Sequence, residues 1–169
     1  MRAGIALGSN VGDRLLALQS ALLAVQTITG VSTPVLCSSI YETAPVESGA
    51  EAGPFLNAVM EVEYEGTPFL LLKALQAIES QMGRPDQRAR NAPRTIDLDI
   101  LYMGELQSSV PHLQLPHPRL HLRRFVLEPL AEIQPALLLP GQERPIKEIL
   151  TRLEDPASVE RAESQWGAL

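Results

Sequence analysis

The chain has 169 residues, of which 45% are hydrophobic and 20% charged, a composition typical of a single globular domain. Its formal net charge of −6 argues against general binding to nucleic acid. The single cysteine excludes an internal disulfide, and the sequence contains neither a signal-peptide pattern nor an apolar run long enough to span a bilayer. We therefore expect a soluble cytoplasmic protein without a membrane partner.

The first half of the chain alternates between strand and helix patterns. A short apolar stretch over 2–8 predicts a buried strand, and the helical spacing of leucines after Asp13 predicts a helix that this residue caps. Strand formers over 33–43 and an alternating stretch over 55–64 predict two further strands. The segment 44–54 between them is rich in Pro, Gly, Ala and Glu and predicts a loop.

The second half continues with a helix and a strand. Thr67-Pro68 begins a helix that stops at Gly83, and an arginine-rich loop over 84–94 leads into a strand that ends at Gly104. A short helix over 146–153 and a loosely patterned tail over 155–169 follow. The order of elements is that of the ferredoxin-like βαββαβ sandwich. We therefore predict an α+β domain over 1–169, with an antiparallel sheet, two helices on one face and a C-terminal appendage.

Two carboxylates interrupt the predicted strand Pro-Arg-Thr-Ile-Asp-Leu-Asp-Ile-Leu at residues 93–101. Since side chains alternate along a strand, Asp97 and Asp99 share one face while Leu98 and Ile100 point to the other. Adjacent carboxylates repel each other unless a cation lies between them, and hard oxygen ligands suit magnesium, which often shares its shell with substrate phosphates. The alternative is a polar strand face that pairs with nearby arginines.

Arginines gather in two places on this acidic chain, and either group alone also fits a solvated loop. The clusters are Arg84, Arg88, Arg90 and Arg94, and Arg119, Arg123 and Arg124. Guanidinium groups beside paired carboxylates are suited to clamping a small polyanion. The pattern as a whole indicates a site for a metal and a phosphate.

The stretch Arg90-Asn-Ala-Pro-Arg-Thr-Ile-Asp-Leu-Asp-Ile-Leu101 resembles the signature of the 6-hydroxymethyl-7,8-dihydropterin pyrophosphokinase family of the folate pathway. The resemblance covers nearly the whole chain to about residue 150. Further matching motifs, in the family's order, are Gly8-Ser9-Asn10, Tyr41-Glu42-Thr43, Phe55-Leu56-Asn57, Gly83-Arg84, Leu115-Pro116-His117-Pro118 and Arg123-Arg124-Phe125-Val126-Leu127.

The resemblance implies an ATP-dependent enzyme that transfers pyrophosphate to the hydroxymethyl group of the reduced pterin and releases AMP. It implies two magnesium ions held by Asp97 and Asp99, small-molecule substrates only, no nucleic-acid partner and a monomer. The implied catalytic residues are Arg84, Arg94, Asp97 and Asp99. The implied ATP contacts are Gln76, Glu79, Arg84, Arg94, the backbone of Ile100, His117 and Arg123. The implied pterin contacts are Thr43, the backbone near Val46, Phe55, Asn57, Asp97 and Phe125.

Some residues depart from the family pattern, and other interpretations stay open. The departures are Ala44, Asp86 and Asn91-Ala92, which affect the details of loop closure. Without the resemblance, Phe55 and Phe125 would be read as core residues. A nucleotidyltransferase also pairs a Gly-Ser turn with an Asp-x-Asp strand, but there the turn closely precedes the carboxylates. A non-catalytic ferredoxin-like binding domain would need neither carboxylate, and magnesium-dependent ATP binding would distinguish it.

Overall fold

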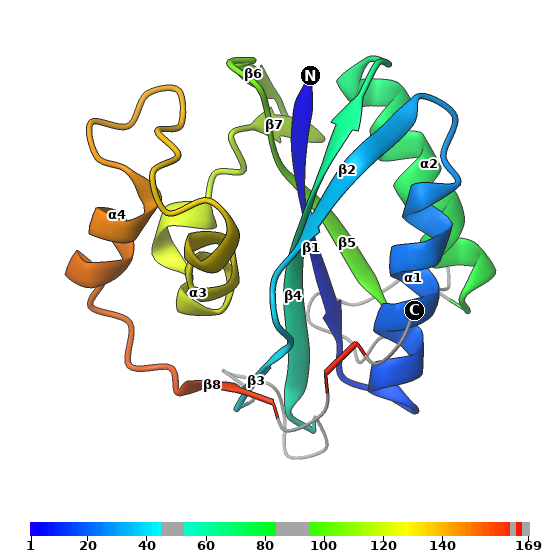
Figure 1. The fold of residues 1–169 in the computed structure, drawn as a ribbon, viewed down its shortest axis with the longest axis horizontal. Coiled ribbons are helices and arrows are strands. Elements are labelled where there is room, and N and C mark those ends of the chain that lie inside the picture. The colour runs from blue at the N-terminus through cyan, green and yellow to red at the C-terminus, as the bar shows by residue number, and fades with distance from the viewer. Residues whose placement is uncertain (45–52, 84–94, 163–164, 167–169) are drawn as a thin grey trace.

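The computed structural model describes residues 1–44, 53–83, 95–162 and 165–166 (Figure 1). In chain order the elements are β1 (Arg2–Ser9), α1 (Arg14–Gln26), β2 (Val31–Cys37), β3 (Tyr41–Thr43), β4 (Phe55–Tyr64), α2 (Pro68–Gln81), β5 (Asp97–Met103), β6 (Ser108–Val110), β7 (Leu113–Leu115), the 3-10 helix η1 (Leu120–Leu122), α3 (Arg124–Ile133), α4 (Ile146–Arg152) and β8 (Val159–Arg161).

The main sheet is antiparallel, and β1 lies between β4 and the edge strand β5. Its strand order is β5-β1-β4-β3-β8, and β2 pairs with the other half of β4. Strands β2 and β3 therefore share the position of the second strand in the predicted βαββαβ order, and β6 and β7 form a separate hairpin. The ferredoxin-like prediction is confirmed.

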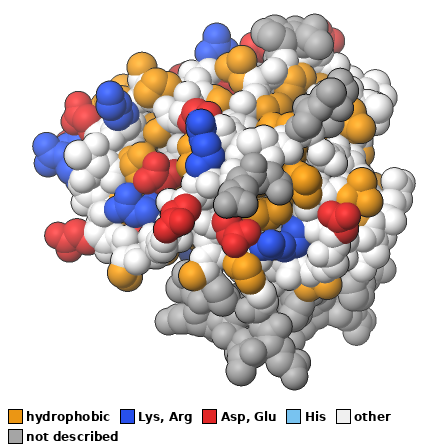
Figure 2. Space-filling view, turned by 60° about the horizontal axis from the view of Figure 1, so that its bottom comes forward, with side chains coloured by type: hydrophobic (Ala, Val, Ile, Leu, Met, Phe, Trp, Pro, Cys, Tyr) orange, Lys and Arg blue, Asp and Glu red, His pale blue; other side chains and the backbone are white. Residues whose placement is uncertain are grey.

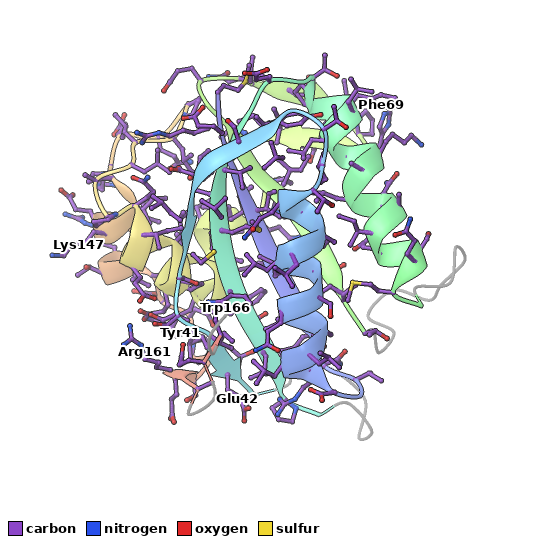
Figure 3. The ribbon with its side chains drawn as sticks, turned by 45° about the vertical axis from the view of Figure 1, so that its right-hand side comes forward. Tyr41, Glu42, Phe69, Lys147, Arg161 and Trp166 are labelled. Atoms are coloured by element: carbon purple, nitrogen blue, oxygen red, sulfur yellow. The ribbon has the colours of Figure 1, made fainter. Side chains whose placement is uncertain are left out.

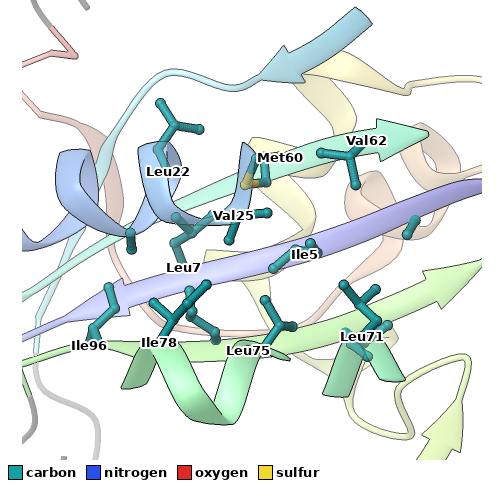
Figure 4. Packing of buried hydrophobic residues seen from close by; sticks show 14 of the residues in the cluster. Ile5, Leu7, Leu22, Val25, Met60, Val62, Leu71, Leu75, Ile78 and Ile96 are labelled. Carbon is teal, nitrogen blue, oxygen red and sulfur yellow. The ribbon is translucent and has the colours of Figure 1, made fainter. Parts of the chain in front are cut away.

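Helices α1 and α2 cover one face of the sheet, as predicted (Figure 1). The Asp13 carboxylate accepts a hydrogen bond from the Leu16 N–H at 3.0 Å, and the Thr67 hydroxyl accepts one from Leu70 at 3.3 Å. These two bonds satisfy N–H groups that the first turn of a helix leaves free. The apolar stripes of both helices then pack on β1, β4 and β5, as Figure 4 shows.

The predicted C-terminal appendage forms a third layer on the other face of the sheet (Figure 1). Helices α3 and α4 bury a second apolar cluster there, with Leu127 and Ile146 fully enclosed against Val59 and Leu101. This layer covers only part of the sheet face. A cleft lined by residues of the sheet and of α3 lies beside it. No helix within the described ranges is both long enough and apolar enough to cross a membrane.

A bulge in β5 directs two consecutive residues toward the apolar cluster under α3 and α4. Gly4 of β1 lies opposite Tyr102 and Ile5 lies opposite Ile100, so Leu101 is an extra residue in β5. The bulge turns both Leu101 and Tyr102 toward the α3 layer. The Tyr102 ring lies directly over Gly4, where any Cβ would overlap it, and its hydroxyl donates to the buried carboxylate of Glu61.

The C-terminal segment is attached to the sheet, although the sequence predicts a loose tail. Strand β8 pairs with β3 as an added edge strand, and the Ala162 N–H donates to the carbonyl of Ile40 at 2.9 Å. The Trp166 indole N–H donates to the carbonyl of Ser38 at 2.7 Å. Backbone pairing of this kind needs no apolar pattern, which is why the polar composition of the tail did not reveal it.

Candidate active site

A cleft of about 670 Å³ opens on the face of the sheet that carries α3. Its walls come from the end of β1, the beginnings of β4 and β5, the first turn of α3, and the segment between α4 and β8. The cleft thus gathers parts of the chain that are far apart in sequence.

Small residues of β1 form the floor of the cleft. Gly8 lies opposite Asp97 on one side and Asn57 on the other, and Ala6 lies opposite Asp99. Neighbouring strands are separated by about 5 Å, so the carboxylate strand and Asn57 lie roughly 10 Å apart across this floor. A larger side chain at position 8 would project into that gap.

The two carboxylates lie on the cleft face of β5, as the alternation predicts. Asp97 and Asp99 line the cleft and are each half-buried. Leu98 and Ile100 point the other way, into the core under α1 and α2. The strand therefore combines a polar face with a core face, and removing either carboxylate would leave that core intact.

His117 lies against the same strand. Its backbone N–H donates to the carbonyl of Leu101 at 2.7 Å, and its Nδ1 accepts from the Arg119 N–H at 3.2 Å. Burial lowers the pKa of His117, with Asp99 opposing the shift and Arg123 adding to it. The imidazole is therefore neutral at pH 7, and because Nδ1 is an acceptor, its proton lies on Nε2.

The opposite side of the cleft is aromatic and amide-lined. Phe55 begins β4 and Phe125 lies in the first turn of α3, and both line the cleft. The Asn57 amide donates to the Thr43 hydroxyl at 2.9 Å, and both side chains are buried. The guanidinium of Arg123 lies 5.4 Å from the centre of the Phe125 ring. Both phenylalanines are half-buried, and Phe125 also packs against the apolar cluster under α3 and α4.

Three of the proposed nucleotide residues lie outside the cleft, toward the outer edge of β5. The Glu79 carboxylate, on α2, accepts from the Leu98 N–H at 2.9 Å. That bond shows that Leu98 directs its N–H away from β1. Because the direction repeats every second residue, the backbone groups of Ile100 point to the same outer edge. Gln76 is exposed on the same helix as Glu79.

Several predicted positions lie outside the described residues: Val46, Arg84, Asp86, Asn91-Ala92 and Arg94. Ala44 is described, is exposed and lines the cleft. Within the described part of the chain no group of three or more His, Cys, Asp or Glu side chains is arranged to hold a metal ion.

Among the residues that line the cleft, Arg119 was predicted only as a member of the second arginine cluster, whereas Leu122, Asp155 and Ala157 were not predicted as site residues. The last two belong to a segment in which burial alternates. Leu153, Asp155, Ala157 and Val159 are half-buried, whereas the residues between them are exposed. This period of two was the available signal for an extended segment packed on one face. It is weak because only two of its four inward residues are large and apolar.

The fold and the cleft together define a class of protein before any comparison is made. A ferredoxin-like sheet carries paired carboxylates, a neutral histidine and arginines beside an aromatic pocket. Such a constellation suits an enzyme that positions a phosphorylated substrate against a flat one. Figure 2 shows the end of the molecule formed by β3 and β8, where acidic and basic side chains are interspersed over the described surface.

Comparison with known proteins identifies the family. The chain matches the model of 7,8-dihydro-6-hydroxymethylpterin-pyrophosphokinase over residues 4–135, and it belongs to that family. It is 45% identical over 131 residues to the 2-amino-4-hydroxy-6-hydroxymethyldihydropteridine pyrophosphokinase of Bacillus subtilis, covering 78% of this chain and 77% of the relative. It is 39% identical over 162 residues to the enzyme of the same name from Methylorubrum extorquens, covering 96% and 99%.

A solved structure supports the fold. The HPPK-DHPS of Plasmodium falciparum superposes with a TM-score of 0.68 at 15% identity, over 89% of this chain and 44% of that one. At this identity the likeness concerns the fold alone. The chain thus spans under half of that longer protein.

Proposed function

We propose that the cleft between β1, β4, β5 and α3 is the active site of an ATP-dependent pyrophosphokinase. The enzyme transfers a pyrophosphoryl group from ATP to the hydroxymethyl group of 6-hydroxymethyl-7,8-dihydropterin, a reaction of folate biosynthesis that leaves AMP. The assignment of the reaction is supported by membership of the family. Its location is supported by one observation: carboxylate, histidine and arginine side chains line the same cleft as a wall of aromatic and amide side chains.

Asp97 and Asp99 are proposed to hold two magnesium ions together with the phosphates of ATP. The donor set fits: two half-buried carboxylates face the cleft from one strand, and oxygen ligands with open positions suit magnesium. Bound there, magnesium would neutralise phosphate charge and align the triphosphate. The chain's own contribution is to hold both carboxylates on a rigid strand, because Leu98 and Ile100 anchor that strand in the core.

The ATP is proposed to extend from the cleft over the edge of β5. The Nε2–H of neutral His117 is proposed to donate to a phosphate oxygen and Arg123 to supply positive charge, because both residues line the cleft and Nδ1 of His117 already accepts a backbone N–H. Arg84 and Arg94, from the loop before β5, are proposed as further phosphate ligands. The nucleoside would then lie along the outer edge of β5, beside the backbone of Ile100 and the side chains of Gln76 and Glu79.

The pterin is proposed to lie between Phe55 and Phe125. A flat heterocycle gains from stacking on both faces and from donors and acceptors at its edge. Asn57 and Thr43, which are linked by a hydrogen bond, are proposed to bind that edge, with the backbone near Val46 as a further contact. Asp97 lies across the Gly8 floor from Asn57, so a pterin held by Asn57 would direct its hydroxymethyl group toward the carboxylates.

The direct test incubates the protein with ATP, magnesium and the reduced hydroxymethylpterin and measures AMP. Wild type should form AMP in proportion to pterin consumed. Asp97→Ala and Asp99→Ala should each lose nearly all turnover while unfolding within about 1 kcal/mol of wild type, since neither change opens a core cavity. Glu105→Ala, an exposed carboxylate just beyond the same strand, is the matched control.

Near-normal turnover of either folded aspartate variant at saturating magnesium would contradict the two-metal assignment. Magnesium-independent ATP binding without AMP formation would instead favour a non-catalytic binding domain. Two finer statements belong to the same proposal: the enzyme acts as a monomer, which sedimentation would check, and it works in the cytoplasm, where the free thiol of Cys37 would stay reduced.

A further inference from the structure

The first turn of α3, which carries Phe125, lacks a cap from its own sequence. The helix begins at Arg124, and the preceding residue Arg123 makes no side-chain capping bond. The opening N–H groups of a helix need acceptors, and a turn without them frays readily. Something else must therefore hold the turn that presents Phe125 to the cleft.

The acceptor comes from the C-terminal segment. The Asp155 carboxylate accepts the Arg124 N–H through Oδ2 at 2.9 Å, and its other oxygen accepts the Ala157 N–H at 2.9 Å. The Arg124 guanidinium in turn donates to the backbone carbonyls of Leu153 at 3.0 Å and Asp155 at 3.4 Å. The two residues thus bind each other's backbone and lock the segment to the helix.

The same segment is fastened to the opposite wall of the cleft. Four residues beyond Asp155, Val159 pairs with Thr43, and β8 continues along β3 to Tyr41. Tyr41, Glu42 and Arg161 lie together at this edge of the sheet in Figure 3. Four extended residues span roughly 13 Å. Residues 155–159 therefore connect the wall that carries Phe125 to the wall that carries Thr43.

We propose that Asp155 is a positioning residue for the pterin side of the cleft: by capping α3 it fixes Phe125 relative to Thr43 and Asn57. Asp155 and Ala157 line the cleft, so the connecting segment also closes one side of it. The inference deepens the proposed function and rests on it. It adds a residue beyond the part of the chain that the family model matches, residues 4–135.

The test compares three variants in steady-state assays with wild type. Asp155→Ala removes both acceptors and should raise the KM for pterin about fivefold, the change that loss of a typical helix cap would produce. The KM for ATP should change less than twofold, and kcat should stay near wild type. Asp155→Asn keeps one acceptor for the Arg124 N–H and should lie between wild type and Asp155→Ala.

Glu154→Ala is the matched control, because it removes an exposed carboxylate from the outward side of the same segment. It should behave as wild type. Wild-type pterin KM in a folded Asp155→Ala would overturn the proposal, as would equal rises for ATP and pterin or a fall in kcat alone. If Asp155→Ala does not fold, Asp155→Asn decides the question by the same criteria.

A second readout does not depend on catalysis. Hydrogen exchange should show that the Arg124 amide loses protection in Asp155→Ala while amides in the middle of α3 keep theirs. Unchanged protection at Arg124 would overturn the capping role whatever the enzyme does. If wild type forms no AMP but Asp155→Ala loses this protection, then the proposed function fails while the capping role stands.

Discussion

Single residues of the sheet divide sharply between those that the fold requires and those that the cleft requires. Gly4 and Gly8 lie on the same face of β1, yet only Gly4 is covered by a ring, that of Tyr102. At Gly8 an added Cβ would make an ordinary contact of 3.4 Å with the Asn57 amide oxygen. The first glycine therefore serves packing, whereas the second keeps space open between Asp97 and Asn57.

Phe125→Ala tests the aromatic wall at this scale. It should weaken pterin binding by about 1–3 kcal/mol, the scale of lost stacking on a heterocycle. Magnesium-ATP affinity should change little. Calorimetric titration of each ligand measures both, and a thermal melt measures the accompanying loss of stability.

The matched control is Phe69→Ala on α2, where the ring is 48% exposed and distant from the cleft (Figure 3). This variant should bind both pterin and magnesium-ATP with wild-type affinity. If Phe125 served only the core, its truncation would instead cost roughly 3–5 kcal/mol of stability and leave pterin affinity unchanged.

Cys37 should be nearly inert. Burial raises the pKa of its thiol to about 11 from 9.0. At pH 8 the thiolate, which is the reactive form, is therefore about 100-fold scarcer than in the unfolded chain. Iodoacetamide labelling followed by mass spectrometry should be slow for native protein and fast in denaturant. Equal rates would show that the thiol is accessible in the native state.

Helix α3 is bonded to the C-terminal segment at both of its ends. Its first turn is held by Asp155, and its last turn carries Glu132, whose carboxylate accepts from the Ser39 N–H and hydroxyl at 2.8 Å and from Tyr41 at 3.0 Å. Arg161 of β8 completes this group at 2.7 Å. The helix that forms the cleft wall is thus bonded at its start to the segment that leads into β8, and at its end to Tyr41 of β3 and Arg161 of β8.

Glu132→Ala should destabilise the protein by about 1–3 kcal/mol, because it removes several hydrogen bonds to a charged group. Burial alone would raise the pKa of Glu132. The hydrogen bonds from Ser39 and Tyr41 and the charge of Arg161 lower the pKa by more than burial raises it, so the net pKa lies below its ordinary value of 4.5. Because the pKa of this carboxyl is lower in the folded protein, its charged form stabilises the fold at pH values above the pKa of the unfolded chain. That stabilisation is lost as the pH falls through the pKa of the folded state.

Denaturant unfolding at pH 7 and across the range below 4.5 measures both effects. The difference in the free energy of unfolding between wild type and Glu132→Ala should narrow as the pH falls. Glu128→Ala on the same helix, which loses one surface pair with Arg124, should cost no more than about 0.5 kcal/mol. A constant difference at every pH would show that Glu132 acts by packing and not through its charge.

Across the whole molecule, the main sheet separates two apolar clusters, one under α1 and α2 and one under α3 and α4, and each cluster stabilises a different part of the site. The cluster under α1 and α2 anchors β1, β4 and β5, whereas the cluster under α3 and α4 positions the α3 wall of the cleft relative to that sheet. The single domain predicted from length stays a prediction, and it requires that both clusters unfold in one transition.

Leu75→Ala and Leu127→Ala test this division, because each removes a fully buried leucine from one cluster. Each should cost roughly 2–5 kcal/mol of stability. Only Leu127→Ala, under α3, should also raise the KM for pterin. Calorimetric melts should show one transition in both variants; two separate transitions would indicate two independent units.

The features that could be predicted from the sequence are those that depend on local pattern. Alternation placed Asp97 and Asp99 on one face of a strand and Leu98 on the other, and Thr67-Pro68 fixed the start of α2. The order of elements predicted the sheet, and the motifs predicted the family. These inferences succeed because each depends on residues that are close together in the chain.

The contacts between distant segments could not be predicted from the sequence and became visible only in the folded chain. The bulge at Leu101, the third layer, the pairing of β8 with β3 and the cap from Asp155 all join residues that no local pattern connects. The C-terminal segment is attached by backbone pairing and by polar groups of side chains such as Asp155 and Trp166, and its alternating pattern is weak because only two of its four inward residues are large and apolar. The aromatic and carboxylate sides of the cleft likewise acquire their spacing only when β1 brings β4 and β5 to either side of Gly8.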